Sequence, residues 1–161
     1  MKKIIHDQLY PASVTKILTA LIAIENCPLD DIVTYSNEAV ASIDWQTDSN
    51  IGIKPGEQIT MEQSLYGLLV GSANEVGNAI GEHISGSMGA FVDLMNQRAR
   101  ELGCRDSHFV TTNGTFDENH YTSAYDLALI ARAIFFPMTC CAKCQIRPIT
   151  PSPLLQPSAR K

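Results

Sequence analysis

The sequence has few charged residues and no long apolar run. Charged residues make up 18% of its 161 residues, and 12 Lys and Arg against 17 Asp and Glu give a formal net charge of −5. This acidic balance excludes a nucleic-acid binder that works through bulk positive charge. The apolar stretch at residues 17–24 is interrupted by Thr19, and it is far shorter than the roughly 20 residues of a membrane-spanning helix. We therefore expect no nucleic-acid partner and no membrane segment in this chain.

The beginning of the sequence has little of the apolar character of an export signal. Met1, Lys2 and Lys3 resemble the basic start of a signal peptide, but His6 and Asp7 follow them. A signal peptide has a run of about 7 to 15 apolar residues at that place. The expectation is that this chain carries no signal peptide.

Acidic residues are absent from the last part of the chain. All 17 acids lie in residues 1–135, whereas residues 136–161 have four basic residues, five of the eight prolines and three of the five cysteines. Proline this dense is incompatible with helices and central strands. We expect a folded domain over 1–135 and a basic tail rich in Pro and Cys over 136–161, which is disordered or translated out of frame.

The apolar spacing of residues 1–135 predicts a mostly helical domain. Capping signals and apolar stripes place helices close to residues 13–26, 37–41, 61–70, 72–84, 87–102 and 122–134. Ser36 and Ser87 are expected as N-caps, Thr60 with Gln63 as a capping box, and Gly103 as a left-handed cap. Short strands are expected at 31–35 and 108–112, a turn at 54–57 and another at 113–114.

Ser13 and Lys16 stand three positions apart at the start of the first predicted helix. Residues at this spacing share a helix face, so the Lys16 amine is expected within hydrogen-bonding reach of the Ser13 hydroxyl. Desolvation and the positive end of the helix dipole both favour a neutral lysine, which is the form that can take a proton from a serine. The Ser13 backbone N–H, in the first turn, can donate to a developing oxyanion. This pattern predicts a nucleophile, its general base and half of an oxyanion hole.

The same spacing also occurs by chance, because Ser158 and Lys161 repeat it in the tail. The alternative interpretation of Ser13 and Lys16 is a helix cap and a lysine that extends to solvent. A second motif, Ser72-Ala73-Asn74, is the only Ser-x-Asn triplet in the chain. Ser-x-Asn accompanies Ser-x-x-Lys in one class of acyl-transferring enzymes. Ser72 with Glu75 also fits a capping box, so a helix cap, a catalytic serine or both remain open.

Three segments in order, residues 11–20, 71–75 and 119–132, resemble the serine-type D-alanyl-D-alanine carboxypeptidases, which are low-molecular-weight penicillin-binding proteins. The likeness runs from about residue 9 to residue 134. The resemblance implies the α/β (α+β) fold of the serine β-lactamases and penicillin-binding-protein transpeptidases. For this chain it implies mainly the helical lobe, with an incomplete antiparallel sheet.

The resemblance also implies a role for each motif residue. Ser13 would attack the bond between the last two D-alanines of a peptidoglycan stem peptide, with Lys16 as general base. Ser72 would pass the proton to the leaving D-alanine, and Asn74 would hold the substrate backbone. β-Lactams would acylate Ser13, and neither a metal nor a cofactor is required. Such enzymes work outside the cytoplasm, in the cell envelope.

Two departures from the family pattern predict impaired activity. The family's third motif, Lys-Thr-Gly or Lys-Ser-Gly, binds the terminal carboxylate, and its strand supplies the second oxyanion donor. No Lys in these 161 residues is followed by Thr-Gly or Ser-Gly. Loss of one oxyanion donor lowers a rate by about 10²- to 10³-fold. The start is also short, without the strands that precede Ser-x-x-Lys in the family.

Three alternatives belong to other classes. A non-catalytic fragment would at most bind β-lactams or be acylated by them. A class A β-lactamase would use a glutamate such as Glu75 for deacylation, but its Ser-Asp-Asn is Ser-Ala-Asn here. A small α-helical interaction domain with a cysteine-rich tail is the third alternative. Cys141 and Cys144 have the spacing of half a zinc site or a redox pair, but the tail has no histidine and no second Cys-x-x-Cys, which favours unstructured thiols.

The remaining reactive side chains show no clear partner pattern in the sequence. Cys27 and Cys104 are expected as small buried residues and not as a disulfide. His120 follows Asp117 and Glu118 and is expected in a surface loop before the last helix. The other histidines, His6, His83 and His108, have no recognisable partners.

Overall fold

The computed structural model describes residues 4–135 of the chain. Within this range a 3₁₀ turn, six α-helices and two short strands follow one another. In chain order they are η1 (Ala12–Thr15), α1 (Lys16–Asn26), β1 (Ile32–Thr34), α2 (Asn37–Ala41), β2 (Gln58–Thr60), α3 (Met61–Leu69), α4 (Asn74–Ser85), α5 (Met88–Glu101) and α6 (Ala124–Phe135). The expected tail over 136–161 lies outside the described residues.

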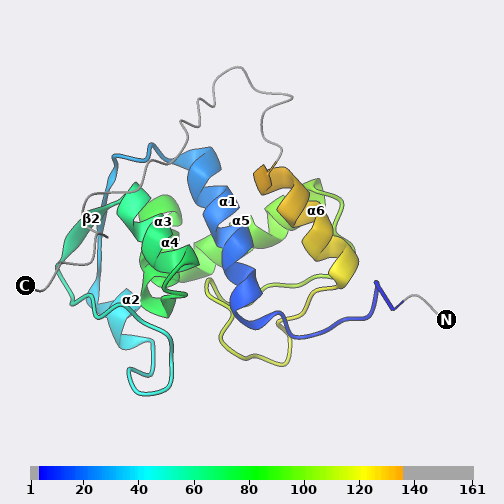
Figure 1. Cartoon of the computed structure of the whole chain (residues 1–161), viewed down its shortest axis with the longest axis horizontal. Coiled ribbons are helices and arrows are strands. Elements are labelled where there is room, and N and C mark those ends of the chain that lie inside the picture. Colours follow the sequence, from blue (N-terminus) through cyan, green and yellow to red (C-terminus); the bar gives the residue numbers. More distant parts are fainter. Residues whose placement is uncertain (1–3, 136–161) are drawn as a thin grey trace, which may run out of the picture.

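Helix α1 lies in the middle of the molecule, with α3 and α4 on one side and α6 on the other (Figure 1). One face of α1 contributes Ala20 and Ala23 to an apolar cluster with β1, α3 and α4. The other face contributes Leu18, Leu21 and Ile22 to a second cluster with α5 and α6. The predicted burial of this helix is confirmed, and packing on both of its faces holds the helix that begins with Lys16.

The two strands form a small antiparallel sheet. Ile32 pairs with Thr60, and Thr34 pairs with Gln58. Strand β1 falls inside the predicted segment 31–35, whereas β2 was not predicted. Val33 is fully buried and its neighbours in β1 are exposed, so the strand contributes one side chain to the first apolar cluster. The helix-rich architecture with a small antiparallel sheet confirms the expected fold class.

Local capping signals set several helix ends as expected. The Ser36 and Ser87 side chains accept hydrogen bonds from the backbone N–H groups of Ala39 and Ala90. Thr60 and Gln63 form the predicted capping box at the start of α3. Gly103 follows α5 in the left-handed conformation, with φ +91°. These ends depend on residues at most three positions apart, which is why the sequence predicts them.

Three local predictions are wrong. Ser72 and Glu75 form no capping box, because the N-cap of α4 is Ala73 and it makes no side-chain cap hydrogen bond. Residues 108–112 form no strand, since only a single bridge pairs His108 with Tyr121. The apolar stripe of the helix predicted at 61–70 includes Leu69 and predicts an inward side chain, but Leu69 is 49% exposed at the end of α3.

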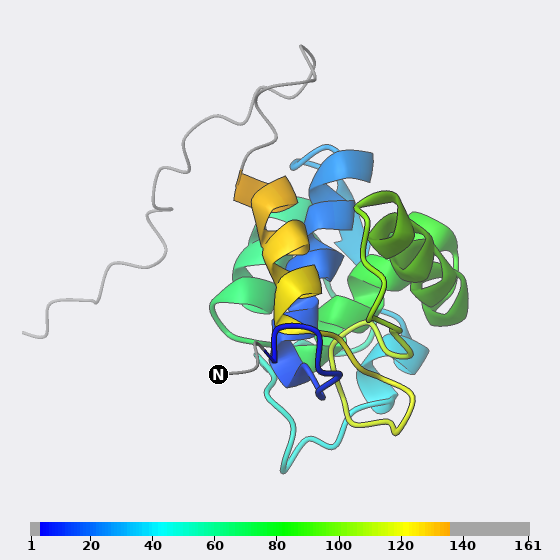
Figure 2. The same cartoon turned by 90° about the vertical axis from the view of Figure 1, so that its right-hand side faces the viewer.

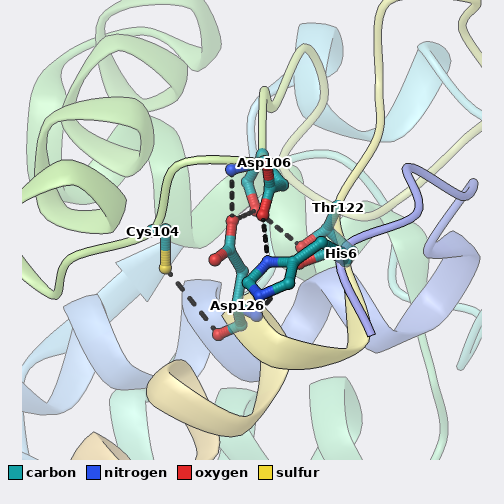
Figure 3. Close-up of polar contacts among 7 residues, drawn as sticks. His6, Cys104, Asp106, Thr122 and Asp126 are labelled. Carbon is teal, nitrogen blue, oxygen red and sulfur yellow. Dashed lines mark hydrogen bonds and ion pairs between the residues drawn. The ribbon is translucent and has the colours of Figure 1, made fainter. Parts of the chain in front are cut away.

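The N-terminal segment is attached to the start of α6 (Figure 3). Leu9 forms an isolated antiparallel bridge with Thr122, and His6 Nδ1 lies 2.7 Å from Asp106 Oδ2. Asp126, in the first turn of α6, is buried and accepts a hydrogen bond from the Asp106 backbone N–H at 2.8 Å. These contacts fix the chain immediately before η1. Figure 2 shows α6 beside α1, in agreement with the shared apolar cluster.

Within residues 4–135, none of the helices has the length and apolar character needed to cross a membrane.

Candidate active site

The first motif places a buried amine next to an exposed hydroxyl. Ser13 lies in η1 and is exposed, whereas Lys16 begins α1 and is only 2% exposed. Lys16 Nζ donates to Ser13 Oγ at 3.1 Å and to the backbone oxygen of Asn113 at 2.8 Å. The hydrogen bond predicted from the three-residue spacing is therefore present. The hydroxyl is accessible to a substrate, and the amine beside it is shielded from solvent.

Burial changes the protonation of this amine. Desolvation lowers the pKa of Lys16 to about 8, although the carboxylates of Asp48 and Glu75 act in the opposite direction and raise it. A lysine with this pKa is neutral in about a tenth of the molecules at pH 7, far more than a lysine with the ordinary pKa. Once neutral, the amine has a lone pair that can accept the Ser13 proton. The pair thus has the geometry and the acid–base property of a nucleophile with its general base.

Asn113 connects Lys16 with the second motif. Its backbone oxygen accepts from Lys16 Nζ, and its side-chain amide donates to the Asn74 backbone oxygen at 3.4 Å and to Asn78 Oδ1 at 3.2 Å. All four residues are buried. A buried polar network with its groups paired is rigid. The start of α4, where Asn74 lies, is therefore held in a fixed position relative to the Lys16 amine.

Strained backbone occurs next to the first motif and within the second. Among residues 4–135, the non-glycine residues with positive φ are Ala12, at +49°, and Ser72, at +53°. This conformation costs a non-glycine residue roughly 1 to 3 kcal/mol, and such residues cluster at functional sites. Ala12 directly precedes Ser13, and Ser72 is the serine of Ser-x-Asn. The strain explains why Ser72 cannot act as the N-cap of α4, whose cap residue has extended backbone.

Gly114 allows the loop after Asn113 to approach η1 closely. Its φ is +90°, and a Cβ at this position would overlap the backbone oxygen of Ala12 and lie 2.9 Å from Thr15 Oγ1. No other residue type fits both the conformation and the space. The predicted turn at 113–114 is therefore a point of close contact that supports the backbone beside Ser13.

The prediction that His120 lies in a surface loop is wrong. His120 is 2% exposed, and its Nε2 lies 2.8 Å from Thr15 Oγ1. Nδ1 accepts hydrogen bonds from the backbone N–H groups of Val110 and Thr111, which assigns the ring proton to Nε2 and makes Thr15 the acceptor. Burial lowers the pKa of His120 to about 4. A neutral imidazole thus holds Thr15, which lies between Ser13 and Lys16.

Sequence reasoning missed Thr15, Asn113 and His120 as parts of the site. Thr15 lies inside the first motif, but its partner His120 is 105 positions away. Asn113 is 97 positions from Lys16 and acts through its backbone oxygen, which any residue has. Gly114 is the one local signal in this part of the site, because a glycine directly after a polar run indicates that another backbone segment lies close to it. The second-motif serine, Ser72, lies two residues before Asn74 and is partly exposed.

The hollows on the described surface include a small one near the first motif and a larger one away from it. One of about 50 Å³ is next to η1 and is lined by residues that include Tyr10, Ala12, Phe116 and His120. A larger one of about 510 Å³ runs along α5, and none of the four motif residues lines it. None of the four motif residues lines the smaller hollow either, but it borders Ala12, which directly precedes Ser13.

The family follows from a comparison with known proteins. The family model described as D-alanyl-D-alanine carboxypeptidase, peptidase S11, matches residues 1–140. The chain therefore belongs to the D-alanyl-D-alanine carboxypeptidase family, as the three sequence segments predicted.

Individual relatives agree with this assignment. The chain is 37% identical over 134 residues to the D-alanyl-D-alanine carboxypeptidase DacF of Bacillus subtilis, covering 80% of this chain and 33% of the relative. It is 35% identical over 141 residues to DacD of Escherichia coli, covering 80% of this chain and 35% of the relative. The chain thus spans about a third of the length of these curated relatives.

Solved structures have the same fold over the region they share with this chain. The D-alanyl-D-alanine carboxypeptidase DacD of Francisella tularensis superposes with a TM-score of 0.77 at 33% identity, over 84% of this chain and 33% of that protein. Penicillin binding protein 6B of Escherichia coli gives 0.78 at 32% identity, over 82% of this chain and 44% of that protein. These similarities confirm the expected fold class.

Proposed function

We propose that the described residues form the acylating part of a serine-type D-Ala-D-Ala carboxypeptidase. The observation that carries this proposal is the 3.1 Å hydrogen bond between the buried Lys16 amine and the exposed Ser13 hydroxyl. The lowered pKa of Lys16 supports it, because a general base must be neutral before it can accept a proton. The reaction requires neither a metal nor a cofactor.

The proposed substrate is a peptidoglycan stem peptide that ends in D-Ala-D-Ala. Lys16 takes the Ser13 proton while Ser13 Oγ attacks the carbonyl carbon between the two D-alanines. Ser72 then passes a proton to the nitrogen of the leaving D-alanine, and Asn74 holds the substrate backbone. Water hydrolyses the resulting ester and regenerates Ser13. The site of action is extracytoplasmic, because stem peptides lie in the cell envelope.

β-Lactams are proposed to react at the same serine. The lactam carbonyl takes the place of the D-Ala-D-Ala peptide bond, Ser13 Oγ forms the ester, and the ring nitrogen takes the proton. The leaving group stays attached, so the ester persists when water is slow to reach it. The observation that supports this reaction is again the accessible Ser13 beside a shielded amine.

A second candidate function is acylation without turnover. It is favoured by the lack of Lys-Thr-Gly or Lys-Ser-Gly in these 161 residues. Without that motif, a second oxyanion donor and the carboxylate site must be supplied by other groups, and one lost donor lowers the rate by about 10²- to 10³-fold. In this case the chain would form a β-lactam ester but release little D-alanine.

The test is D-alanine release from a diacylated Lys-D-Ala-D-Ala tripeptide, measured on the purified chain beside Ser13→Ala. Release by the parent chain that stops in the variant supports the carboxypeptidase. A penicillin adduct without D-alanine release supports the second candidate. A folded parent chain that gives neither product contradicts both. The same tripeptide ending in D-Ala-L-Ala is the substrate control and is expected to remain intact.

A further inference from the structure

Three chemically different metal ligands lie together at the far end of α1 from Lys16. Cys27 is the C-cap of α1, Asp31 directly precedes β1, and His83 is in the last turn of α4. One ligand atom from each lies within 4.8 Å of the other two. His83 Nε2 and Asp31 Oδ2 are 3.5 Å apart. The proposed carboxypeptidase reaction uses none of these residues.

The ligand types and their separation are those of a zinc site. Zinc binds cysteine sulfur at about 2.3 Å and histidine nitrogen or carboxylate oxygen at about 2.0 to 2.2 Å, with tetrahedral geometry. Tetrahedral angles then place the nitrogen and the oxygen about 3.4 Å apart, and the sulfur about 3.6 Å from the oxygen. The observed 3.5 Å between His83 and Asp31 already agrees with this. The Cys27 sulfur lies within 4.8 Å of the other two ligand atoms, so it needs to approach them by at most about 1.2 Å to close the cluster around an ion.

The backbone around the cluster is fixed before any ion binds. The Asp31 backbone oxygen accepts from the Met61 N–H at 2.7 Å, and the Asp31 N–H donates to Pro28 at 3.3 Å. The Cys27 N–H donates to the Ala23 backbone oxygen at 3.0 Å, which ends α1. The three side chains therefore start from rigid elements, which limits the entropy lost when an ion is bound.

The charge of the cluster also suits a divalent cation. On binding, Zn²⁺ forms a bond to sulfur and the thiol proton is released to water. Thiolate and carboxylate together then balance the two positive charges, with neutral His83 as the third ligand.

We propose that Cys27, Asp31 and His83 bind one zinc ion, with water as the fourth ligand. The ion would connect the C-terminal ends of α1 and α4. The opposite ends of these two helices carry Lys16 and Asn74, so the ion would stabilise the arrangement of the two elements that form the candidate active site. The proposal is independent of the carboxypeptidase activity.

The test is binding of zinc and cobalt to the full chain. Cobalt bound by a thiolate gives a sulfur-to-cobalt charge-transfer absorption, which the ordinary carboxylate and imidazole sites lack. We expect one ion per chain, this absorption, and a higher unfolding temperature with zinc. Cys27→Ser is expected to abolish the absorption. His83→Gln is expected to weaken zinc binding by at least about 100-fold. Mutation of a residue that only hydrogen-bonds to a metal ligand already lowers metal affinity by about 10- to 100-fold, and loss of a ligand itself should cost more.

Matched controls separate this site from the other thiols and histidines. A chain with Cys140, Cys141 and Cys144 changed to serine is expected to keep the absorption, and His108→Gln is expected to keep the zinc affinity. Loss of the absorption in the triple variant, with its retention in Cys27→Ser, would overturn the proposal, as would unchanged affinity in His83→Gln. Circular dichroism of the metal-free variants checks the fold, and if Cys27→Ser is unfolded the result with His83→Gln decides.

Discussion

At Lys16, burial and two carboxylates act on the pKa in opposite directions. Desolvation is the larger effect and lowers the pKa to about 8, while Asp48 and Glu75 raise it. The downward direction of the pKa shift matters, because only the neutral amine can take the Ser13 proton. A surface lysine with its ordinary pKa of 10.5 would be almost entirely charged at neutral pH.

The first prediction at this scale concerns pH. The neutral fraction of an amine with a pKa of about 8 rises roughly tenfold between about pH 7 and about pH 9. The rate of Ser13 acylation by a penicillin should therefore rise by about the same factor and level off above that range. Stopped reactions read by intact mass measure this rate. A flat profile would show that Lys16 is not the base, and Lys16→Arg, which stays charged, should acylate slowly throughout.

The second prediction uses the strain at Ser72. Glycine adopts a φ near +53° without penalty, so Ser72→Gly should raise the free energy of unfolding by about 1 kcal/mol relative to Ser72→Ala. Both variants lack the hydroxyl, so both should acylate more slowly than the parent if Ser72 relays a proton. Urea unfolding measures the first effect. Equal stability of the two variants would mean that the backbone at Ser72 is not strained.

At the scale of elements, helix ends set by local capping signals were predicted from the sequence, whereas the helix end set by contacts between distant residues was not. The caps at Ser36, Thr60 and Ser87 were predicted because each bond spans three residues. The capping box at Ser72 failed because Ser72 has left-handed backbone and the Glu75 carboxylate is used by a distant partner. Glu75 Oε1 accepts from the Ile51 backbone N–H, 24 positions away. A partner at that distance cannot be read from spacing.

The third prediction concerns the contact between Gly114 and η1. In Gly114→Ala the new Cβ would overlap the Ala12 backbone oxygen, so the turn before Ser13 must move. Gly56 is the matched control, because its φ is +87° and nothing lies within 4 Å of an added Cβ. Gly56→Ala should cost about 1 to 2 kcal/mol from backbone strain alone. Gly114→Ala should cost at least about 2 kcal/mol more and should also slow acylation. Equal costs in thermal unfolding would contradict the close contact.

At the scale of the whole molecule, α1 joins two apolar clusters and carries Lys16 at its start. The sequence predicted the burial of this helix, because its apolar residues cover most of the circumference. It did not predict which segments surround the site, since Thr15 contacts His120 and Lys16 contacts Asn113 across about a hundred positions. The three segments that resemble the family predicted the fold class. In that fold, residues about a hundred positions apart come into contact.

The fourth prediction is the pH dependence of global stability. Burial holds the pKa of His120 at about 4, below its ordinary value of 6.5, with Asp117 opposing the shift and His108 adding to it. Below pH 6.5 the unfolded chain binds a proton that the folded chain does not, so stability falls as the pH drops toward 4. The loss from this group is about 3 kcal/mol.

The measurement is urea unfolding across this pH range for the parent and for His120→Gln. The variant keeps a side-chain donor for Thr15 but has no titrating group. Between pH 6.5 and 4, the free energy of unfolding should fall by about 3 kcal/mol less in His120→Gln than in the parent chain. A parallel fall in both chains would show that His120 is protonated in the folded state or is accessible to solvent.

The central claim is that Ser13, activated by Lys16, is the nucleophile. The most direct measurement is the intact mass of the full chain after incubation with a penicillin, beside Ser13→Ala and Ser72→Ala, with peptide mapping of any adduct. We predict one penicillin per chain on Ser13, no adduct in Ser13→Ala, and a slower adduct on Ser13 in Ser72→Ala. An adduct that persists in Ser13→Ala, or a folded parent chain that forms none, would contradict the account.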